Sequence, residues 1–314
     1  MRLTLQRGFR RLNFLIRPPL PQAKCKRFVA VLLLLSSATL CLAPSGIAQN
    51  QSATALPSEP PRSWIEQAAA NEVRIIDADG TFPLRYRQRK NDAKGDTTRE
   101  IIESREGSVA RLIERNGQPI TAAEDAGERQ RLTDSLASPS DFIKHHKRDS
   151  SMRSDVMSLV RLMPQAMIYT YVPGQPQLPG STSKQIVIDF QPDPKFKPPT
   201  LFSGVLTGLA GRFWIDQQTH QLTRGEAHVL HDVDFGWGIL GAVHRGGKVA
   251  FEQTDSGNGR WFYSHLEEQL TLRVLVKTLP QNSVMTNSDF RQMPAMVPYQ
   301  EAIRILLAIS IPLR

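Results

Sequence analysis

Apolar and polar residues alternate through most of the second half of the chain, and this alternation predicts strands with one buried face. The longest alternation covers residues 259–277, which at about 3.3 Å per residue would cross and curve around a whole domain. The residues expected on one face of this strand are Phe262, Leu266, Leu270, Leu272 and Val274. Similar patterns predict strands over residues 166–172, 184–190, 208–216, 221–234, 247–255 and 281–291.

The first half of the chain mixes helical and strand patterns. Phe82, Leu84 and Tyr86 are spaced to share one strand face, and a turn signal predicts a hairpin between strands 97–105 and 108–115. Thr121 and Glu124 have the spacing of a capping box, which marks the start of a helix. Helices are predicted over residues 63–75 and 122–136, with one or two more over 140–163.

These elements predict an α+β protein in which a curved antiparallel sheet, an incomplete β-barrel, packs over helices. We expect a single half-barrel domain over residues 62–293, with a helical insertion at 121–163. Residues 49–61 are polar and rich in proline, which predicts a flexible lead-in. Residues 294–314 form an apolar tail that could be a buried strand, a short helix or a segment touching a membrane, and the buried forms are favoured.

The first residues of the chain have the layout of a secretory signal peptide. A basic cluster ending at Arg27 precedes an apolar run at residues 28–35, and Gly46 and Ala48 follow with the small-x-small spacing of a cleavage site. The sequence therefore predicts a signal peptide over residues 1–48 and export to the periplasm or cell envelope. An uncleaved N-terminal anchor is the alternative, although the apolar run is short for a membrane span.

Removal of this leader changes the charge and the cysteine content. The leader contains eight of the 39 basic residues and no acidic one, which leaves 31 basic against 30 acidic side chains. Nearly balanced charge gives no sign of a nucleic-acid partner, because binding to phosphates requires a basic surface. Both cysteines, Cys25 and Cys41, lie in the leader, so the mature chain has no disulfide and no cysteine metal site.

Sequence motifs for catalysis are few. The chain has no nucleophile elbow, no Walker loop and no His-Glu-x-x-His motif, so we predict no catalytic residue, no metal site and no cofactor. Residues 236–241 match a dinucleotide fingerprint, but a strand-like segment follows where a helix is needed, which favours a glycine-rich connection. An exported hydrolase would have to use scattered acid–base groups such as Glu268 with His228 or His265.

Several short patterns resemble one known group of proteins. Residues 211–222 contain a strand ending in Trp214-Ile215-Asp216, a turn and a second strand. Two further patterns are similar to those of a related set of secreted proteins. One is residues 115–121, and the other is Phe251-Glu252-Gln253 followed by Trp261 on the next strand and Ser288-Asp289-Phe290 on the last one. Over residues 80–290 the order of elements resembles the LolA-like and LolB-like periplasmic lipoprotein carriers and the outer-membrane lipoprotein-sorting proteins. The resemblance implies an incomplete barrel whose concave apolar face accepts acyl chains, and it implies no catalytic residues.

The function predicted from the sequence is that of an exported, non-enzymatic carrier or binding protein for a lipid or acylated lipoprotein. An envelope hydrolase and a structural envelope component are the alternatives. The expected partners are a lipid or acylated protein and an envelope protein, together with a membrane surface that the tail would contact. The candidate ligand-binding residues are Phe82, Leu84, Tyr86, Phe262, Leu266, Leu270, Leu272 and Val274.

Overall fold

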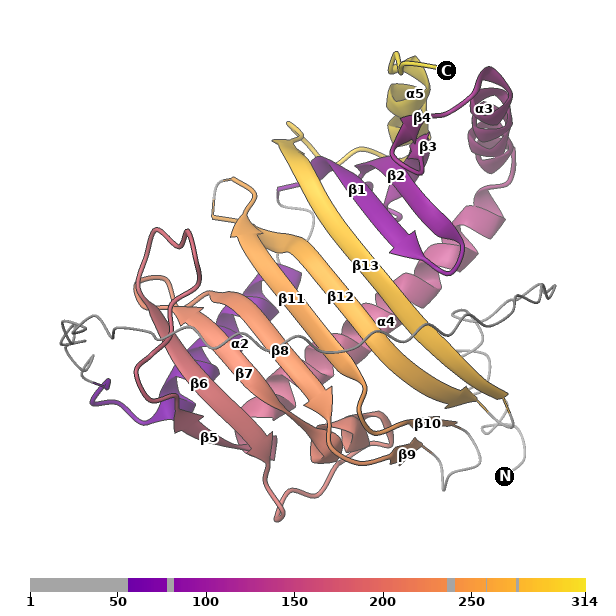
Figure 1. Ribbon diagram of the computed structural model, residues 1–314. Helices are drawn as coiled ribbons and strands as arrows, with labels where there is room; N and C mark the ends of the chain where they lie inside the picture. Colours follow the sequence, from indigo (N-terminus) through magenta and orange to yellow (C-terminus); the bar gives the residue numbers. More distant parts are fainter. Residues whose placement is uncertain (1–55, 78–81, 236–240, 258, 275–276) are drawn as a thin grey trace, which may run out of the picture. The chain divides into compact units, whose positions relative to one another are not determined.

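An open antiparallel sheet forms most of the protein from residue 56 onward in a computed structural model (Figure 1). The structure describes residues 56–77, 82–235, 241–257, 259–274 and 277–314. The sheet is not closed into a barrel and helices pack against it, so the protein is α+β, as predicted. The predicted leader, the first part of the lead-in and residues 236–240 of the glycine motif lie outside the described residues.

The strands are ordered β4-β3-β2-β1-β13-β12-β11-β8-β7-β6-β5, and neighbours pair antiparallel. The short strands β9 and β10 pair with each other, and β10 extends the ladder of β12. The first long strand, β1, pairs with the last, β13, so strands from opposite ends of the sequence are neighbours inside the sheet. The bounds are β1 Leu84–Asp92, β2 Gly95–Ile102, β3 Val109–Arg115, β4 Gln118–Pro119, β5 Met167–Tyr171, β6 Gln185–Pro192, β7 Leu209–Asp216, β8 Leu222–Val229, β9 Val233–Phe235, β10 Gly241–Val243, β11 Lys248–Asp255, β12 Trp261–Val274 and β13 Lys277–Gln292.

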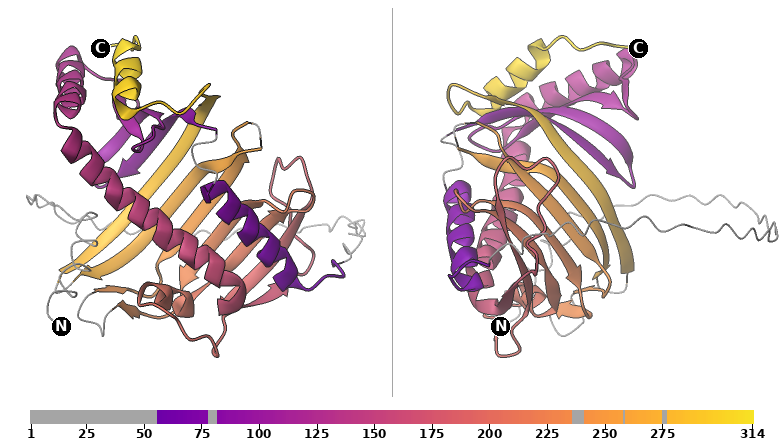
Figure 2. Two further views of the ribbon diagram at one scale, coloured as in Figure 1. Left: turned by 180° about the vertical axis from the view of Figure 1, so that it is seen from behind. Right: turned by 60° about the vertical axis from the view of Figure 1, so that its left-hand side comes forward.

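Helices lie on one face and along one edge of this sheet. The helices are α2 (Pro61–Asp77), α3 (Ala122–Ala137), α4 (Pro139–Ala166), the 3-10 helix η2 (Phe202–Gly208) and α5 (Tyr299–Ala308). Figure 2 shows α2 and α4 crossing the same face, and the sheet bends toward them. The helix face is therefore the concave one. Within the described residues no helix has the length and apolar character needed to span a membrane.

Local signals placed several elements correctly. The capping box is present: Thr121 accepts a hydrogen bond from the Glu124 backbone N–H, and the Glu124 carboxylate accepts from the Thr121 N–H at 2.8 Å. The hairpin of β2 and β3 also forms where it was predicted. Local turn and cap chemistry decides such features, so sequence alone was sufficient.

Two predicted strand boundaries were wrong, each because of a contact that the local pattern does not contain. The strand expected over 221–234 is divided into β8 and β9, since Asp232 accepts from the Arg245 N–H at 2.7 Å and turns the chain. The last strand begins at Lys277 despite Pro280, because β1 pairs with β13 only from Ser283 onward. The missing N–H of Pro280 therefore breaks no ladder bond with β1. The region 140–163 forms one helix, α4, which is one of the two predicted arrangements, and this helix continues through Pro164 to Ala166.

The main core lies between α2, the C-terminal end of α4 and the strands β5–β7. The apolar stripe of α2, formed by Trp64, Ile65 and Ala68, is at least 94% buried. Opposite it, Ile186 and Ile188 of β6 are fully or almost fully buried. The helical spacing of the α2 stripe and the alternation of β6 thus pair one apolar helix face with one apolar sheet face.

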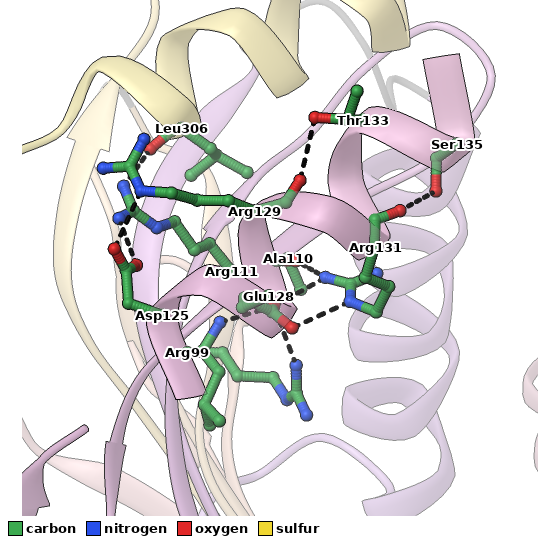
Figure 3. A network of polar contacts seen from close by, with 11 residues as sticks. Arg99, Ala110, Arg111, Asp125, Glu128, Arg129, Arg131, Thr133, Ser135 and Leu306 are labelled. Carbon is green, nitrogen blue, oxygen red and sulfur yellow. Dashed lines mark hydrogen bonds and ion pairs between the residues drawn. The ribbon is translucent and has the colours of Figure 1, made fainter. Parts of the chain in front are cut away.

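Helix α3 protects the edge of the sheet at β3 with charged side chains (Figure 3). The Leu112 N–H donates to the Glu128 carboxylate at 2.8 Å, and Arg131 donates to the Ala110 carbonyl. Arg131 also donates to Glu128 at 2.7 Å. Backbone groups that would otherwise be free for another strand are therefore occupied, which blocks edge-to-edge pairing.

The predicted apolar tail forms α5, in agreement with the favoured buried form. Its residues Tyr299, Ala302, Ile303 and Leu306 are at least 99% buried in a cluster with β2 and β3. The fully buried Arg111 guanidinium donates to the Leu306 and Ile309 carbonyls and to Asp125, so it closes the C-terminal end of the helix. Contact of the tail with a membrane stays a prediction; of its described large apolar side chains, only Leu313 is mostly exposed to solvent.

Candidate functional site

The concave face of β12 carries three of the eight predicted ligand-binding residues, Leu266, Leu270 and Leu272. Leu266 pairs directly with Phe251 of β11, and paired residues share a face. Phe251 packs against the core cluster that contains the α2 stripe, so Leu266 also lies on the helix face. Leu270 and Leu272 follow at even spacing and point the same way.

These three leucines continue into a wider apolar area, which we name the apolar strip. Leu266 is flanked by Met285, and Leu272 pairs with Val243 on one side and Leu279 on the other. The strip consists of Leu266, Leu270, Leu272, Val249, Val243, Leu279 and Met285. All except Val243 are only half-buried. The strip is therefore part of the concave face that the chain does not fully cover.

Two details shape the strip. Leu270 lies over Gly247, where an added Cβ would come within 2.8 Å of the leucine side chain, so glycine lets the leucine lie close to the sheet. Glu268 interrupts the strip and accepts a hydrogen bond from the Ser283 hydroxyl at 2.9 Å. The strip thus has one polar pair between two apolar parts.

A β-bulge changes which residues share this face. The pairing shifts by one residue near Ser264, and Tyr263 pairs with Gln253. The Tyr263 ring packs edge-on against Phe251, with centroids 5.5 Å apart. Tyr263 therefore lies on the same face as Leu266, and the adjacent Phe262 points to the other face. The expectation that Phe262 shares a face with Leu266 was wrong, because a bulge breaks strict alternation.

The other predicted residues divide into two groups. Leu84 and Tyr86 are buried in a small cluster, and Phe262 packs against Tyr86 with ring centroids 5.0 Å apart. Phe82 precedes the first residue of β1 and is exposed, so its expected place on the strand face was wrong. The side chain of Val274 lies outside the described residues. The structure thus brings together Leu266, Leu270 and Leu272 along β12, and separately Leu84, Tyr86 and Phe262.

A buried acid beside the strip was missed from the sequence. Glu72 of α2 is 7% exposed, and both of its carboxylate oxygens accept from the Gln253 amide at 3.1 Å. Burial raises the pKa of Glu72 from its usual 4.5 to about 7, while the hydrogen bond from Gln253 opposes this rise. The helical stripe of α2 indicated which face is buried, but only the sheet register shows that Gln253 lies opposite.

The convex face is polar and differs sharply from the strip. Arg224 forms ion pairs with Glu226 and Glu252, and Arg212 pairs with Asp189 at 2.7 Å.

The acid–base residues proposed for a hydrolase do not lie together. His265 and Glu268 are three positions apart on β12, where His265 pairs with Thr286 and Glu268 pairs with Ser283. Their side chains therefore point to opposite faces of the sheet. Glu268 and His265 therefore cannot act on one bond.

Two surface cavities lie away from the strip. One of about 460 Å³ is bounded by α3, β3, the start of α4 and α5, and another of about 410 Å³ lies between α2 and α4. None of the predicted ligand-binding residues lines either cavity. In the described parts of the chain, no three His, Cys, Asp or Glu side chains are grouped as a metal site would require.

Comparison with known proteins gives only a weak resemblance in fold. No protein-family model and no curated protein matches the chain. An outer membrane lipoprotein-sorting protein domain from Vibrio parahaemolyticus is 9% identical, with a TM-score of 0.32 over 77% of this chain and 98% of that one. MucB, solved in complex with MucA(peri), is 8% identical, with a TM-score of 0.21 over 75% of this chain and 100% of that one.

Proposed function

We propose that this protein is an exported, non-enzymatic binding protein that holds the apolar chain of a lipid or an acylated partner against the apolar strip. The observation that carries the proposal is the half-buried state of Leu266, Leu270 and Leu272 on the concave face. A row of leucines on the inner side of a bent sheet, only partly covered by the chain itself, is a surface that an apolar ligand would complete.

The energetics favour an alkyl chain as the ligand. Each methylene group removed from water contributes about 0.8 kcal/mol, and leucine side chains gain in the same way when they are covered. The three leucines at the centre of the strip follow one strand, β12, so their row matches an extended chain better than a compact ring. Glu268 and Ser283, already hydrogen-bonded to each other, can border such a chain without leaving an unsatisfied polar group.

Export is the second part of the proposal and rests on the leader. Residues 28–35 and the Gly46-Ile47-Ala48 site support processing by a signal peptidase. Cell fractionation of the full chain and of a chain lacking residues 1–48 tests this directly. We expect the full chain outside the cytoplasm and N-terminal sequencing to begin near Gln49; cytoplasmic retention of both would contradict export.

Ligand binding is tested with a matched pair of substitutions on the two faces. Leu266→Asp places a charge in the strip, whereas Val284→Asp places one on the opposite face, where Val284 pairs with Glu267 and is 39% exposed. Titration with the fluorescent apolar probe N-phenyl-1-naphthylamine should show an affinity loss on the order of tenfold or more for Leu266→Asp, and none for Val284→Asp.

Native mass spectrometry of gently purified protein, followed by lipid extraction, gives a second measurement. We expect a bound lipid in the wild type and less in Leu266→Asp, with circular dichroism confirming that both variants are folded. A wild type that neither carries lipid nor binds the probe would reject the proposal, as would equal losses in the two variants.

A further inference from the structure

A short loop between β6 and η2 exposes an unusual combination of side chains. The loop comprises residues 194–202, Pro-Lys-Phe-Lys-Pro-Pro-Thr-Leu-Phe. Leu201 is 58% exposed and Phe202 is 42% exposed, next to one another. Lys195 and Lys197 precede them and are also exposed. Residues 194–202 contain no acidic residue, although Asp193 immediately precedes them, and they combine two apolar side chains with two positive charges.

The loop is held in place by its own contacts. Thr200 and Ser203 cap each other: the Thr200 N–H donates to the Ser203 hydroxyl at 3.0 Å, and the Ser203 N–H donates to Thr200 Oγ1 at 3.1 Å. At the other end the Lys195 N–H donates to the Asp193 carboxylate at 2.8 Å, and Phe196 packs against the main core. Phe196 therefore points inward, while Leu201 and Phe202 stay exposed on a fixed backbone.

The loop lies at the end of the sheet where the apolar strip ends. Strand β6 ends at Pro192, just before the loop. Antiparallel pairing places the end of β8 and the start of β11 at this same end of the sheet. The Val229 N–H donates to the Gly247 carbonyl, and Gly247 lies under Leu270 of the strip. In Figures 1 and 2 the loop extends beyond this end of the sheet.

We propose that the loop 194–202 docks on an anionic lipid surface, with Leu201 and Phe202 entering the interfacial region and Lys195 and Lys197 contacting the lipid head groups. Exposed leucine and phenylalanine side chains next to lysines fit the boundary between acyl chains and anionic head groups. The proposal goes beyond ligand binding in the strip and does not depend on it. It also places the membrane contact on this loop instead of on the C-terminal tail, whose large apolar side chains are buried or half-buried apart from Leu313.

Vesicle sedimentation tests the proposal with protein purified in its exported form. The vesicles consist of phosphatidylcholine alone, or of phosphatidylcholine and phosphatidylglycerol in a ratio of roughly 7:3. We expect binding to the anionic vesicles that weakens at high salt, because screening reduces the attraction between lysine and head group. Lys195→Gln with Lys197→Gln should lower the partition coefficient about fivefold per lysine. Leu201→Ser with Phe202→Ser should lower it on the order of tenfold.

The controls change the same residue types elsewhere. Lys94→Gln with Lys184→Gln removes two exposed lysines, and Lys184 lies at the opposite end of β6 from the loop. Val284→Ser removes an exposed apolar side chain from the convex face. Both controls should bind vesicles like the wild type.

Three results would overturn the proposal: no binding of the wild type to anionic vesicles, full binding by both loop variants, or equal losses in the controls. If Leu313→Ser alone abolishes binding, the tail is the membrane contact and the proposal fails. The proposals of ligand binding in the strip and of membrane docking by the loop are tested separately. The loop variants should bind N-phenyl-1-naphthylamine like the wild type, and Leu266→Asp should bind vesicles like the wild type.

Discussion

The two halves of the concave face start from similar sequence patterns and end in different states. Under α2, the apolar residues Ile186, Ile188 and Ile215 are at most 1% exposed. On β12, Leu266 and Leu270 also alternate with polar residues, yet they remain half-buried. Alternation therefore decides which face of a strand is apolar, but a covering helix decides whether that face is closed.

The covered half is closed because α2 carries a matching surface. Trp64, Ile65 and Ala68 form one stripe, and the Trp64 ring packs against His220 in a tilted arrangement with centroids 4.8 Å apart. Further along the helix the stripe gives way to polar residues, with Glu72 against Gln253. The apolar contact of α2 thus ends near the place where the strip begins.

The largest expected effect compares one residue from each half. Ile188→Ala would leave a cavity in a fully packed core and should lower the free energy of unfolding by about 2–5 kcal/mol. Leu266→Ala removes a side chain that solvent already reaches, so its cost should be clearly smaller. Urea unfolding of both variants measures the difference; equal losses would mean that the two halves are packed alike.

The second prediction concerns Glu72 and pH. The folded protein holds this proton up to a pKa of about 7, whereas the unfolded chain releases it near 4.5, so between these values the folded state binds more protons. Glu72 should therefore stabilise the folded state fully below pH 4.5, and this contribution of roughly 3 kcal/mol should be lost as the pH rises through 7. Glu72→Gln should remove this dependence.

A matched control exists on the same helix. Glu66 is exposed and pairs with Arg62 at 3.0 Å, so Glu66→Gln should leave the pH profile unchanged. Urea unfolding between pH 4 and 8 provides the measurement. A Glu72→Gln profile that runs parallel to the wild-type profile over this range would contradict the environment assigned to Glu72.

The third prediction adds a ligand to the open half. An apolar ligand that binds only the folded protein should raise the free energy of unfolding by about 2.7 kcal/mol at a concentration of 100 Kd. Leu266→Asp should lose this gain, and Val284→Asp should keep it. Thermal unfolding with and without a fatty acid tests this, and stabilisation that is equal in both variants would place the ligand elsewhere.

The contrast between the halves also shows what the sequence could reveal. The capping box of α3, the alternation of β12 and the helical stripe of α2 depend on neighbouring residues, and all were predicted. The bulge near Ser264 and the break before Asp232 depend on strands far away in the chain, and both were missed. Local chemistry identifies elements, but register is set by tertiary contacts.

The candidate site divides in the same way. Leu266, Leu270 and Leu272 follow from a period of two along one strand, so sequence placed them together. Phe82 was misplaced because the strand begins two residues later, at Leu84. The environment of Glu72 requires knowledge of which strand lies under α2, and no spacing within the helix contains that information.

The smallest expected effect tests how α2 is held at its polar end. The Asn71 amide donates to the Thr219 carbonyl at 3.0 Å and to the His220 carbonyl at 3.1 Å, which joins the helix to the turn between β7 and β8. Asn71→Ala should lower the free energy of unfolding by about 1 kcal/mol, since each such bond contributes modestly. Gln67→Ala is the control, because Gln67 bonds only weakly within its own helix, at 3.4 Å. Hydrogen exchange should show faster opening of α2 amides in Asn71→Ala than in Gln67→Ala, and the β12 amides should be unchanged. A uniform change across the sheet would mean that α2 and the strands of the apolar strip unfold as one unit.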